Sequence, residues 1–148
     1  MDSEPGTEST LGPAATLRVV AAVMYDAAGC VLIAQRPAGK FLAGKWEFPG
    51  GKLEPGESAE AGLARELAEE LGVQLQSCRP LLSLRHDYPH ARVELATLLV
   101  ERYTGEPAGR EGQALKWVRP AELYGEDLLP ADRPIVDRLQ ATARSEAQ

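Results

Sequence analysis

The stretch from Gly51 to Val73 most constrains the fold, because a glycine-containing loop runs there into a strongly patterned helix. Ser58 is a suitable N-cap for this helix, and Gly72 is a suitable residue to end it. At about 100° of rotation per residue, one face is apolar and the neighbouring face is acidic. The apolar face carries Leu63, Leu67 and Leu71, and the acidic face carries Glu66, Glu69 and Glu70. The pattern predicts a helix that packs on a core through its leucines and carries a row of carboxylates beside them.

The acidic face of this helix needs a physical explanation. Glu66 stands three residues before Glu69 and four before Glu70, and like charges at these spacings repel by about 0.2–0.5 kcal/mol per pair. A divalent cation would offset the repulsion, and oxygen ligands without a neighbouring His or Cys favour Mg²⁺ or Mn²⁺ over zinc. A solvated acidic helix face is the alternative interpretation. The spacing alone leaves both open.

The order of residues in this stretch resembles the Nudix hydrolase box. Gly51 is followed after five residues by Glu57, and Glu57 is followed after seven residues by the run RELAEELGV over residues 65–73. The flanking segments GKWEFPGGK, VERYTGEPAGREGQ and LLPADRPIV extend the likeness to MutT-type nucleoside triphosphate pyrophosphohydrolases, over residues 17–139. The resemblance implies an α+β domain of the Nudix fold, a mixed β-sheet in an α/β/α sandwich. It also implies hydrolysis of a nucleoside triphosphate to the monophosphate and pyrophosphate.

The composition limits the class of protein. The 148 residues, 44% of them hydrophobic, suffice for a single domain, and we expect a monomer or a homodimer. The net charge of −6 argues against a nucleic-acid polymer as the partner, because such proteins usually carry a basic face. The chain has neither a signal-peptide pattern nor an apolar run that could span a bilayer, so we expect no membrane association and a cytoplasmic location. Residues 1–16 are polar and predict a disordered tail before a Nudix domain over residues 17–143.

Apolar and β-branched runs predict the strands of the domain. Residues 17–25 and 30–35 flank a turn-forming tetrad and predict a hairpin. Further strands are expected over residues 46–48, 77–85, 93–103 and 114–118. A short helical turn is expected over residues 120–124, and a final amphipathic helix over residues 134–143.

The resemblance implies a divalent-metal site, with Mg²⁺ or alternatively Mn²⁺ as the cofactor. The implied ligands are the carbonyl of Gly50 or Gly51 and the carboxylates of Glu57, Glu66, Glu69, Glu70 and Glu111. Glu66, Glu69 and Glu111, together with Arg65, are the expected catalytic residues. Arg65 would orient the acids by a bidentate contact, and Glu111 would be a further ligand or the base that activates water. A surface arginine and a loop glutamate without a role are the alternatives.

Five residues are expected to contact the substrate: Arg36, Phe48, Lys52, Tyr88 and Asp132. Lys52 lies beside the glycines of the box, where a cation would meet the polyphosphate. Arg36 is either a second phosphate ligand or a charge that ends a strand. By strand alternation Phe48 shares a face with Trp46, so it lies either at the base pocket, as the resemblance implies, or in the core.

Asp132 departs from the best known guanine-reading MutT-type enzymes, which have asparagine at the matching position. An amide both donates and accepts, whereas an ionised carboxylate only accepts. Asp132 could accept from the N–H edge of guanine or 8-oxoguanine, or from the amino group of cytosine, and an N-cap of the final helix is its structural alternative. We expect 8-oxo-dGTP as the substrate. A CTP or 5-methyl-dCTP pyrophosphohydrolase is the alternative, and a nucleotide sensor that does not cleave its ligand is a third hypothesis.

Overall fold

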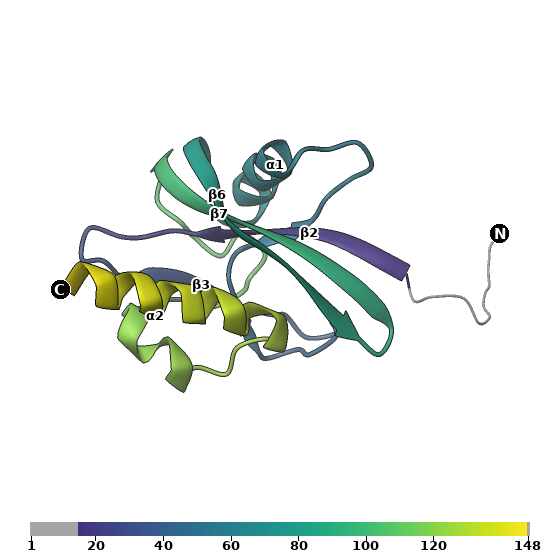
Figure 1. Cartoon of the computed structure of the whole chain (residues 1–148). Coiled ribbons are helices and arrows are strands. Elements are labelled where there is room, and N and C mark those ends of the chain that lie inside the picture. Colours follow the sequence, from purple (N-terminus) through teal and green to yellow (C-terminus); the bar gives the residue numbers. More distant parts are fainter. Residues whose placement is uncertain (1–14, 148) are drawn as a thin grey trace.

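The structure is a computed structural model that describes residues 15–147, and side chains over residues 16–142. Its strands lie between two helices, with α1 on one side and α2 on the other (Figure 1). The strands are β2 (Ala15–Val23), β3 (Val31–Gln35), β4 (Trp46–Glu47), β5 (Gly50–Lys52), β6 (Gln74–Tyr88), β7 (Ala91–Thr104) and β8 (Leu115–Val118). The helices are α1 (Ala59–Leu71), the 3₁₀ turns η1 (Pro120–Gly125) and η2 (Pro130–Asp132), and α2 (Arg133–Ala147). The predicted α+β fold with an α/β/α arrangement is confirmed.

The strands divide between two sheets. The larger sheet is mixed, in the order β5-β2-β7-β6, and β2 runs parallel to β7 from Ala15 opposite Ala91 to Val23 opposite Leu99. β5 and β6 join this sheet in antiparallel fashion. The smaller sheet is antiparallel, in the order β4-β3-β8. The pairing of β2 with β5 brings the glycines that precede α1 beside the middle of β2.

The predicted hairpin over residues 17–35 is wrong, although its turn exists. The Asp26 N–H donates to the Cys30 carbonyl at 2.9 Å, and an isolated bridge joins Tyr25 to Val31. Beyond this bridge β2 and β3 separate into different sheets. A strand has only two hydrogen-bonding edges, and both edges of β2 are occupied, one by β5 and the other by β7. β3 therefore pairs with β4 and β8 instead.

Two hydrophobic cores lie on opposite faces of the strands, because successive strand residues point to opposite sides. On β2, Val20 and Ala22 pack toward α1, whereas Ala21 and Val23 pack toward α2. The α1 core contains Leu63, Leu67, Leu71 and Val73, and the α2 core contains Ile135, Val136 and Leu139. The central strands thus hold both helices in place, and α1 turns its leucines inward as predicted.

Helix α1 begins and ends where the sequence predicts. The Ser58 hydroxyl oxygen accepts from the Ala61 N–H at 3.1 Å, and Gly72 has the left-handed conformation, with φ of 73°. Gly62 is buried inside the helix, and a Cβ at this position would collide with the Leu53 side chain and lie 3.0 Å from a Glu57 carboxylate oxygen. The helical glycine therefore lets the loop before α1 pack directly on the helix.

Several element boundaries differ from those expected. β2 begins at Ala15, so residues 15 and 16 of the predicted tail belong to the sheet, and the rest of that prediction, residues 1–14, lies outside the described residues. β6 and β7 extend the two long predicted strands and leave Pro89 and His90 as the turn between them. The final helix continues to Ala147. Cross-strand pairing prolongs β6 and β7 beyond the segments that hydrophobicity marks.

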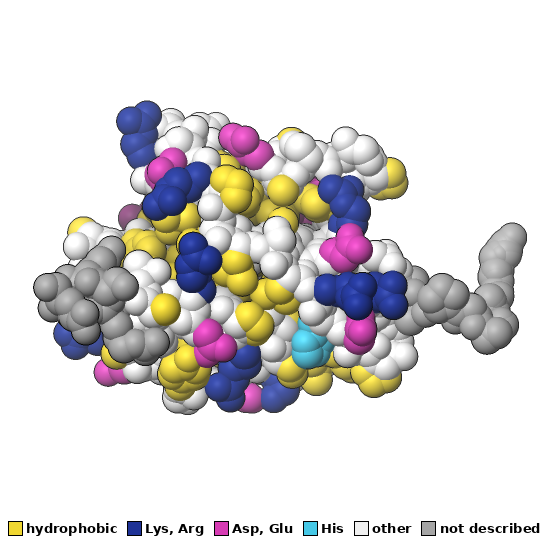
Figure 2. All heavy atoms as spheres, in the orientation of Figure 1, with side chains coloured by type: hydrophobic (Ala, Val, Ile, Leu, Met, Phe, Trp, Pro, Cys, Tyr) yellow, Lys and Arg dark blue, Asp and Glu magenta, His cyan; other side chains and the backbone are white. Residues whose placement is uncertain are grey.

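The surface mixes charges of both signs. Figure 2 shows basic and acidic side chains interspersed over the face turned to the viewer, with apolar side chains between them. In the part of the chain that the structure describes, no helix is both long enough and apolar enough to cross a membrane.

Candidate active site

A cavity of about 620 Å³ lies beside β2 and collects residues from distant parts of the sequence. Its walls come from the box, from the loop over residues 36–42, from the β6–β7 hairpin and from the segment over residues 129–132. The charged side chains that line it are Arg36, Lys40, Glu47, Lys52, Glu66, Glu70 and Asp132. Its apolar wall includes Leu17, Val19, Phe48, Val93 and Leu95. One cavity therefore joins the acidic face of α1 to an apolar pocket.

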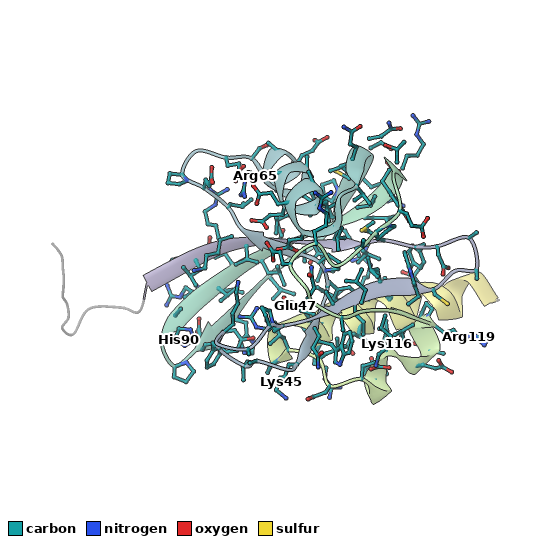
Figure 3. All side chains as sticks on the ribbon, turned by 180° about the vertical axis from the view of Figure 1, so that it is seen from behind. Lys45, Glu47, Arg65, His90, Lys116 and Arg119 are labelled. Atoms are coloured by element: carbon teal, nitrogen blue, oxygen red, sulfur yellow. The ribbon has the colours of Figure 1, made fainter. Side chains whose placement is uncertain are left out.

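Arg65 holds two of the acids of the box. Its Nε and Nη2 each donate at 2.8 Å to the two carboxylate oxygens of Glu57, and its Nη1 donates to Glu66 Oε2 at 3.0 Å. The Glu54 N–H also donates to the Glu57 carboxylate at 2.8 Å. The hydrogen bonds from Arg65, followed by that from Glu54, hold the pKa of the Glu57 carboxyl well below its usual range. Figure 3 shows the side chain of Arg65 on α1, with Glu47 below it in the middle of the molecule. Arg65 thus fixes the orientation of Glu57 and Glu66.

Glu66 and Glu70 are crowded together where α1 faces the glycines. A Cβ at Gly51 would lie only 2.5 Å from the Glu66 carboxylate carbon, so any other residue there would displace this carboxylate. A Cβ at Gly50 would collide with the carbonyl oxygen of Val20. Burial raises the pKa of the Glu70 carboxyl, and so do its hydrogen bond with Glu66 and the negative charges of Glu66, Glu111 and Glu47. Several carboxylates therefore act together on Glu70, although Arg65 pairs with Glu66 and Arg36 pairs with Glu47.

This crowding fits a hard divalent cation. The donors at this end of the cavity are carboxylate and carbonyl oxygens, the atoms that Mg²⁺ prefers. Within residues 15–147, no three acidic, His or Cys side chains already converge as a metal centre. A bound cation would favour the ionised form of these carboxyls and so oppose the effects that raise the pKa of Glu70. The donor chemistry therefore suits the cation, and the carboxylates would adjust around it.

Glu69 and Glu111 lie outside the walls of the cavity. The Glu69 side chain is 59% exposed and makes an ion pair of 3.6 Å with Arg65. Glu111 is exposed and lines a neighbouring depression of about 480 Å³, together with Arg36, which lines both hollows. The negative charge of Glu111 nevertheless contributes to the raised pKa of Glu70, so its carboxylate stands close to the acids of α1.

Asp132 and Tyr88 both line the cavity, and each accepts a hydrogen bond from a backbone N–H. The Asp132 side chain is buried, and its Oδ2 accepts from the Phe48 N–H at 3.1 Å. The Tyr88 hydroxyl oxygen accepts from the Ala131 N–H at 3.3 Å. Burial raises the pKa of the Asp132 carboxyl to about 7, against the opposing effect of the Phe48 N–H. α2 begins at the residue after Asp132, yet the Asp132 carboxylate accepts from Phe48. Phe48 lines the cavity and also belongs to the α2 core, against which Trp46 packs.

Arg36 organises the loop that closes one side of the cavity. It donates to Glu47 Oε1 at 2.9 Å through Nη1 and to the Phe41 carbonyl at 2.8 Å through Nε. Burial raises the pKa of the Glu47 carboxyl, and the charge of Arg36 opposes that rise. The Phe41 ring meets Tyr88 and His90 at centroid distances of 5.4 and 4.5 Å. The aromatic side chains therefore connect this loop to the tip of the β6–β7 hairpin.

Lys40, Phe41 and Glu47 are among the cavity residues that were not singled out from the sequence. Glu47 had a detectable signal, because it is a carboxylate between two aromatic residues on a short strand. Phe41 had a weaker signal, an aromatic residue in a glycine-bounded loop. Lys40 had none. The structure brings Gly50, Glu66, Glu70, Arg36, Phe48, Lys52, Tyr88 and Asp132 to one cavity, and it places Glu57 and Arg65 behind the acids.

Comparisons with known proteins agree with this geometry. A family model described as a NUDIX domain matches residues 19–138. The 8-oxo-dGTP diphosphatase of Escherichia coli (strain K12) is 36% identical over 124 residues, which cover 84% of this chain and 96% of that protein. The CTP pyrophosphohydrolase of the same organism is 38% identical over 125 residues, which cover 84% of this chain and 92% of that protein.

Solved structures are similar over nearly the whole chain. The solution structure of the E. coli ORF135 protein has a TM-score of 0.79 and 36% identity, and the match covers 93% of this chain and 97% of that one. A MutT structure from work on Aliivibrio salmonicida and Vibrio cholerae has a TM-score of 0.73 and 34% identity, covering 86% of this chain and 98% of that one. The fold, the box residues and the relatives agree, and the chain belongs to the Nudix family.

Proposed function

We propose that the protein is a Mg²⁺-dependent pyrophosphohydrolase that converts a nucleoside triphosphate to the monophosphate and pyrophosphate, with 8-oxo-dGTP as its main substrate. The observation that carries the proposal is the single cavity that contains the acids Glu66 and Glu70 and the buried Asp132. A metal-bound polyphosphate requires the acids Glu66 and Glu70, and a nucleobase requires a buried polar group such as Asp132. Its place would be the cytoplasmic nucleotide pool, from which it removes oxidised dGTP, and residues 17–143 would form the catalytic domain.

Glu66 and Glu70 would hold the metal, with the Gly50 carbonyl, Glu57, Glu69 and Glu111 as further ligands, directly or through water. A bound Mg²⁺ supplies charge neutralisation for the phosphoryl oxygens and a water of lowered pKa. Arg65 keeps the box acids oriented through its fork to Glu57. Glu111 accepts the proton of the attacking water. The cationic side chains of Arg36, Lys40 and Lys52 hold the phosphates along the cavity wall.

The water oxygen attacks the β-phosphorus, and the bond from the β-phosphorus to the bridging oxygen of the α-phosphate breaks. The monophosphate leaves with that bridging oxygen, and the new oxygen ends in pyrophosphate. Hydrolysis in ¹⁸O-labelled water followed by mass spectrometry of both products tests this step. Label in the monophosphate would contradict attack at the β-phosphorus.

The base would lie against Phe48 and Tyr88, with its polar edge at Asp132. In its ionised form, which predominates above the pKa of about 7, the Asp132 side chain accepts hydrogen bonds only, and oxidation of guanine converts N7 from an acceptor into an N–H donor. This carboxylate therefore favours the oxidised base. The cytosine amino group is also a donor, and a CTP pyrophosphohydrolase is among the similar proteins, so a CTP or 5-methyl-dCTP pyrophosphohydrolase is a second candidate.

Kinetics on 8-oxo-dGTP, dGTP, dCTP and 5-methyl-dCTP, with wild type and Asp132→Asn, test the proposal. We expect 8-oxo-dGTP to have the highest kcat/KM, and we expect the ratio of 8-oxo-dGTP to dGTP to fall in Asp132→Asn. A buried charge-assisted hydrogen bond contributes about 1.5–3 kcal/mol, which corresponds to roughly ten- to a hundredfold in that ratio. A wild-type preference for the cytosine nucleotides would favour the second candidate, and unchanged ratios would exclude Asp132 from base recognition.

A further inference from the structure

The loop between β7 and β8 closes the C-terminal end of α1. The last carbonyl oxygens of a helix have no partner within the helix itself. The Ala108 N–H donates to the Leu71 carbonyl at 3.1 Å, and the Arg110 N–H donates to the Glu70 carbonyl at 3.0 Å. α1 has no basic residue in its own last turn, so these N–H groups stand where positive charge stabilises a helix end. The loop is therefore fastened to the helix that carries the acids.

Gln113 joins this helix end to Glu111. Its Nε2 donates to the Glu70 carbonyl oxygen at 3.2 Å, and its Oε1 accepts from the Glu111 N–H at 2.9 Å. A side-chain amide can make both contacts because it has a donor and an acceptor. The side chain is half-buried, whereas Glu111 is exposed. One side chain thus connects the backbone of Glu70 to the backbone of Glu111.

We propose that Gln113 is a positioning residue, which holds Glu111 at a fixed place relative to the acids of α1. This inference rests on the role of Glu111 under the proposed function. Glu111 precedes Gly112, whose φ is +83°, so its stretch of loop contains a conformationally permissive residue. The exposed Glu111 carboxylate therefore needs a tether to stay at a constant distance from the acids of α1. A misplacement of about 1 Å can lower a rate by roughly a hundredfold.

The Gln113→Leu substitution removes both hydrogen bonds and keeps a side chain of similar size. We expect kcat to fall by about ten- to a hundredfold with little change in KM, because the phosphates and the base are held elsewhere. Gln140→Leu is the matched control. Gln140 lies on the remote helix α2, and its side-chain amide N–H also donates to a backbone carbonyl, that of Pro120. This control should leave kcat unchanged.

Amide hydrogen exchange of the metal-free protein gives a readout that does not depend on activity. Gln113→Leu should speed exchange of the Glu111 N–H, while the Arg110 N–H remains protected by its own bond to Glu70. Gln113→Glu keeps the acceptor for the Glu111 N–H and loses the donor to Glu70, so it should retain protection at Glu111. Unchanged exchange at Glu111 in Gln113→Leu, or equal loss in both variants, would overturn the tether. If Gln113→Leu folds poorly, Gln113→Ala removes the same two hydrogen bonds with a smaller side chain, and unchanged exchange at Glu111 in that variant would likewise overturn the tether.

A double-mutant cycle separates this inference from the function on which it rests. If Gln113 acts through Glu111, Gln113→Leu should have no further effect on kcat in a Glu111→Gln background. Effects that multiply would show that Gln113 acts independently and would overturn the inference. A Glu111→Gln enzyme with the kcat of wild type would instead refute the proposed role of Glu111 itself.

Discussion

Replacing Asp132 with asparagine tests whether burial controls the ionisation of this carboxyl. Asp132 is 5% exposed, and burial raises the pKa of its carboxyl from the ordinary 3.8 to about 7. Between these two values the folded protein keeps a proton that the unfolded chain has lost, so the free energy of unfolding falls as pH rises. At 1.36 kcal/mol per pH unit, the total loss is on the order of 4 kcal/mol, of which about 2 kcal/mol lies between pH 5.5 and 7.

The direction of the effect follows from the raised pKa. The contribution of the protonated carboxyl is fully present below about pH 4, declines as pH rises toward 7, and stays constant above the folded-state pKa. The Asp132→Asn protein keeps an acceptor for the Phe48 N–H but cannot titrate at this position. Other titrating groups, Glu70 among them, are shared by both proteins and cancel in the difference.

Urea unfolding of the metal-free proteins at pH 5.5, 6, 7 and 8 measures this difference. The free energy of unfolding of wild type minus that of Asp132→Asn should fall by about 2 kcal/mol from pH 5.5 to 7 and then level off. Asp127→Asn is the control, because Asp127 is a 68% exposed carboxylate paired with Lys45, and it should give no such trend. Parallel pH profiles for wild type and Asp132→Asn would refute the argument that the buried carboxyl retains its proton.

Three further predictions concern the box. Glu70→Gln should abolish turnover at saturating Mg²⁺ while raising the thermal stability of the metal-free protein near pH 7, because a neutral amide avoids the cost of burying a carboxyl whose pKa burial and Glu66 raise; near wild-type turnover would refute the metal assignment. Arg65→Lys should lower kcat by about a hundredfold, since an ammonium cannot reproduce the fork to Glu57, and steady-state kinetics with an unchanged kcat would contradict this. Gly62→Ala should lower Tm, because the contact with Leu53 costs about 1–3 kcal/mol against roughly 1 kcal/mol gained in helix propensity; a higher Tm in calorimetry would show that the loop yields freely.

The sequence predicts the local elements of the fold well, because their signals are local. The caps at Ser58 and Gly72 and the stripe of leucines specify α1 within a few residues. The separation of β2 from β3 has no local signal. It depends on which strands pair with the two edges of β2. One of these strands, β7, begins at Ala91, far along the chain.

In the candidate site, too, residues that are close in sequence can be predicted, whereas contacts between remote segments cannot. Glu66, Glu69 and Glu70 are recognisable because their spacing lies within a single helix. Contacts between remote segments are not, such as the bond from the Phe48 N–H to Asp132 or the meeting of Phe41 with His90. The bridge from Gln113 to Glu70 likewise depends on how the loop after β7 folds back on α1. Such contacts require knowledge of the tertiary arrangement.

The parallel pairing of β2 with β7 also has a consequence for the order of folding. α1 has its own caps and can begin to form from local contacts, whereas Ala15 finds Ala91 only after the long intervening chain has been closed into a loop. Closing such a loop costs entropy before its contacts are made, and topologies of this kind fold slowly. During synthesis, a nascent chain that ends before β7 can form the acidic helix, but it has no partner for that edge of β2 and lacks Val93 and Leu95 from the cavity wall. We therefore expect the capacity to bind a nucleotide to arise late, when β7 docks beside β2.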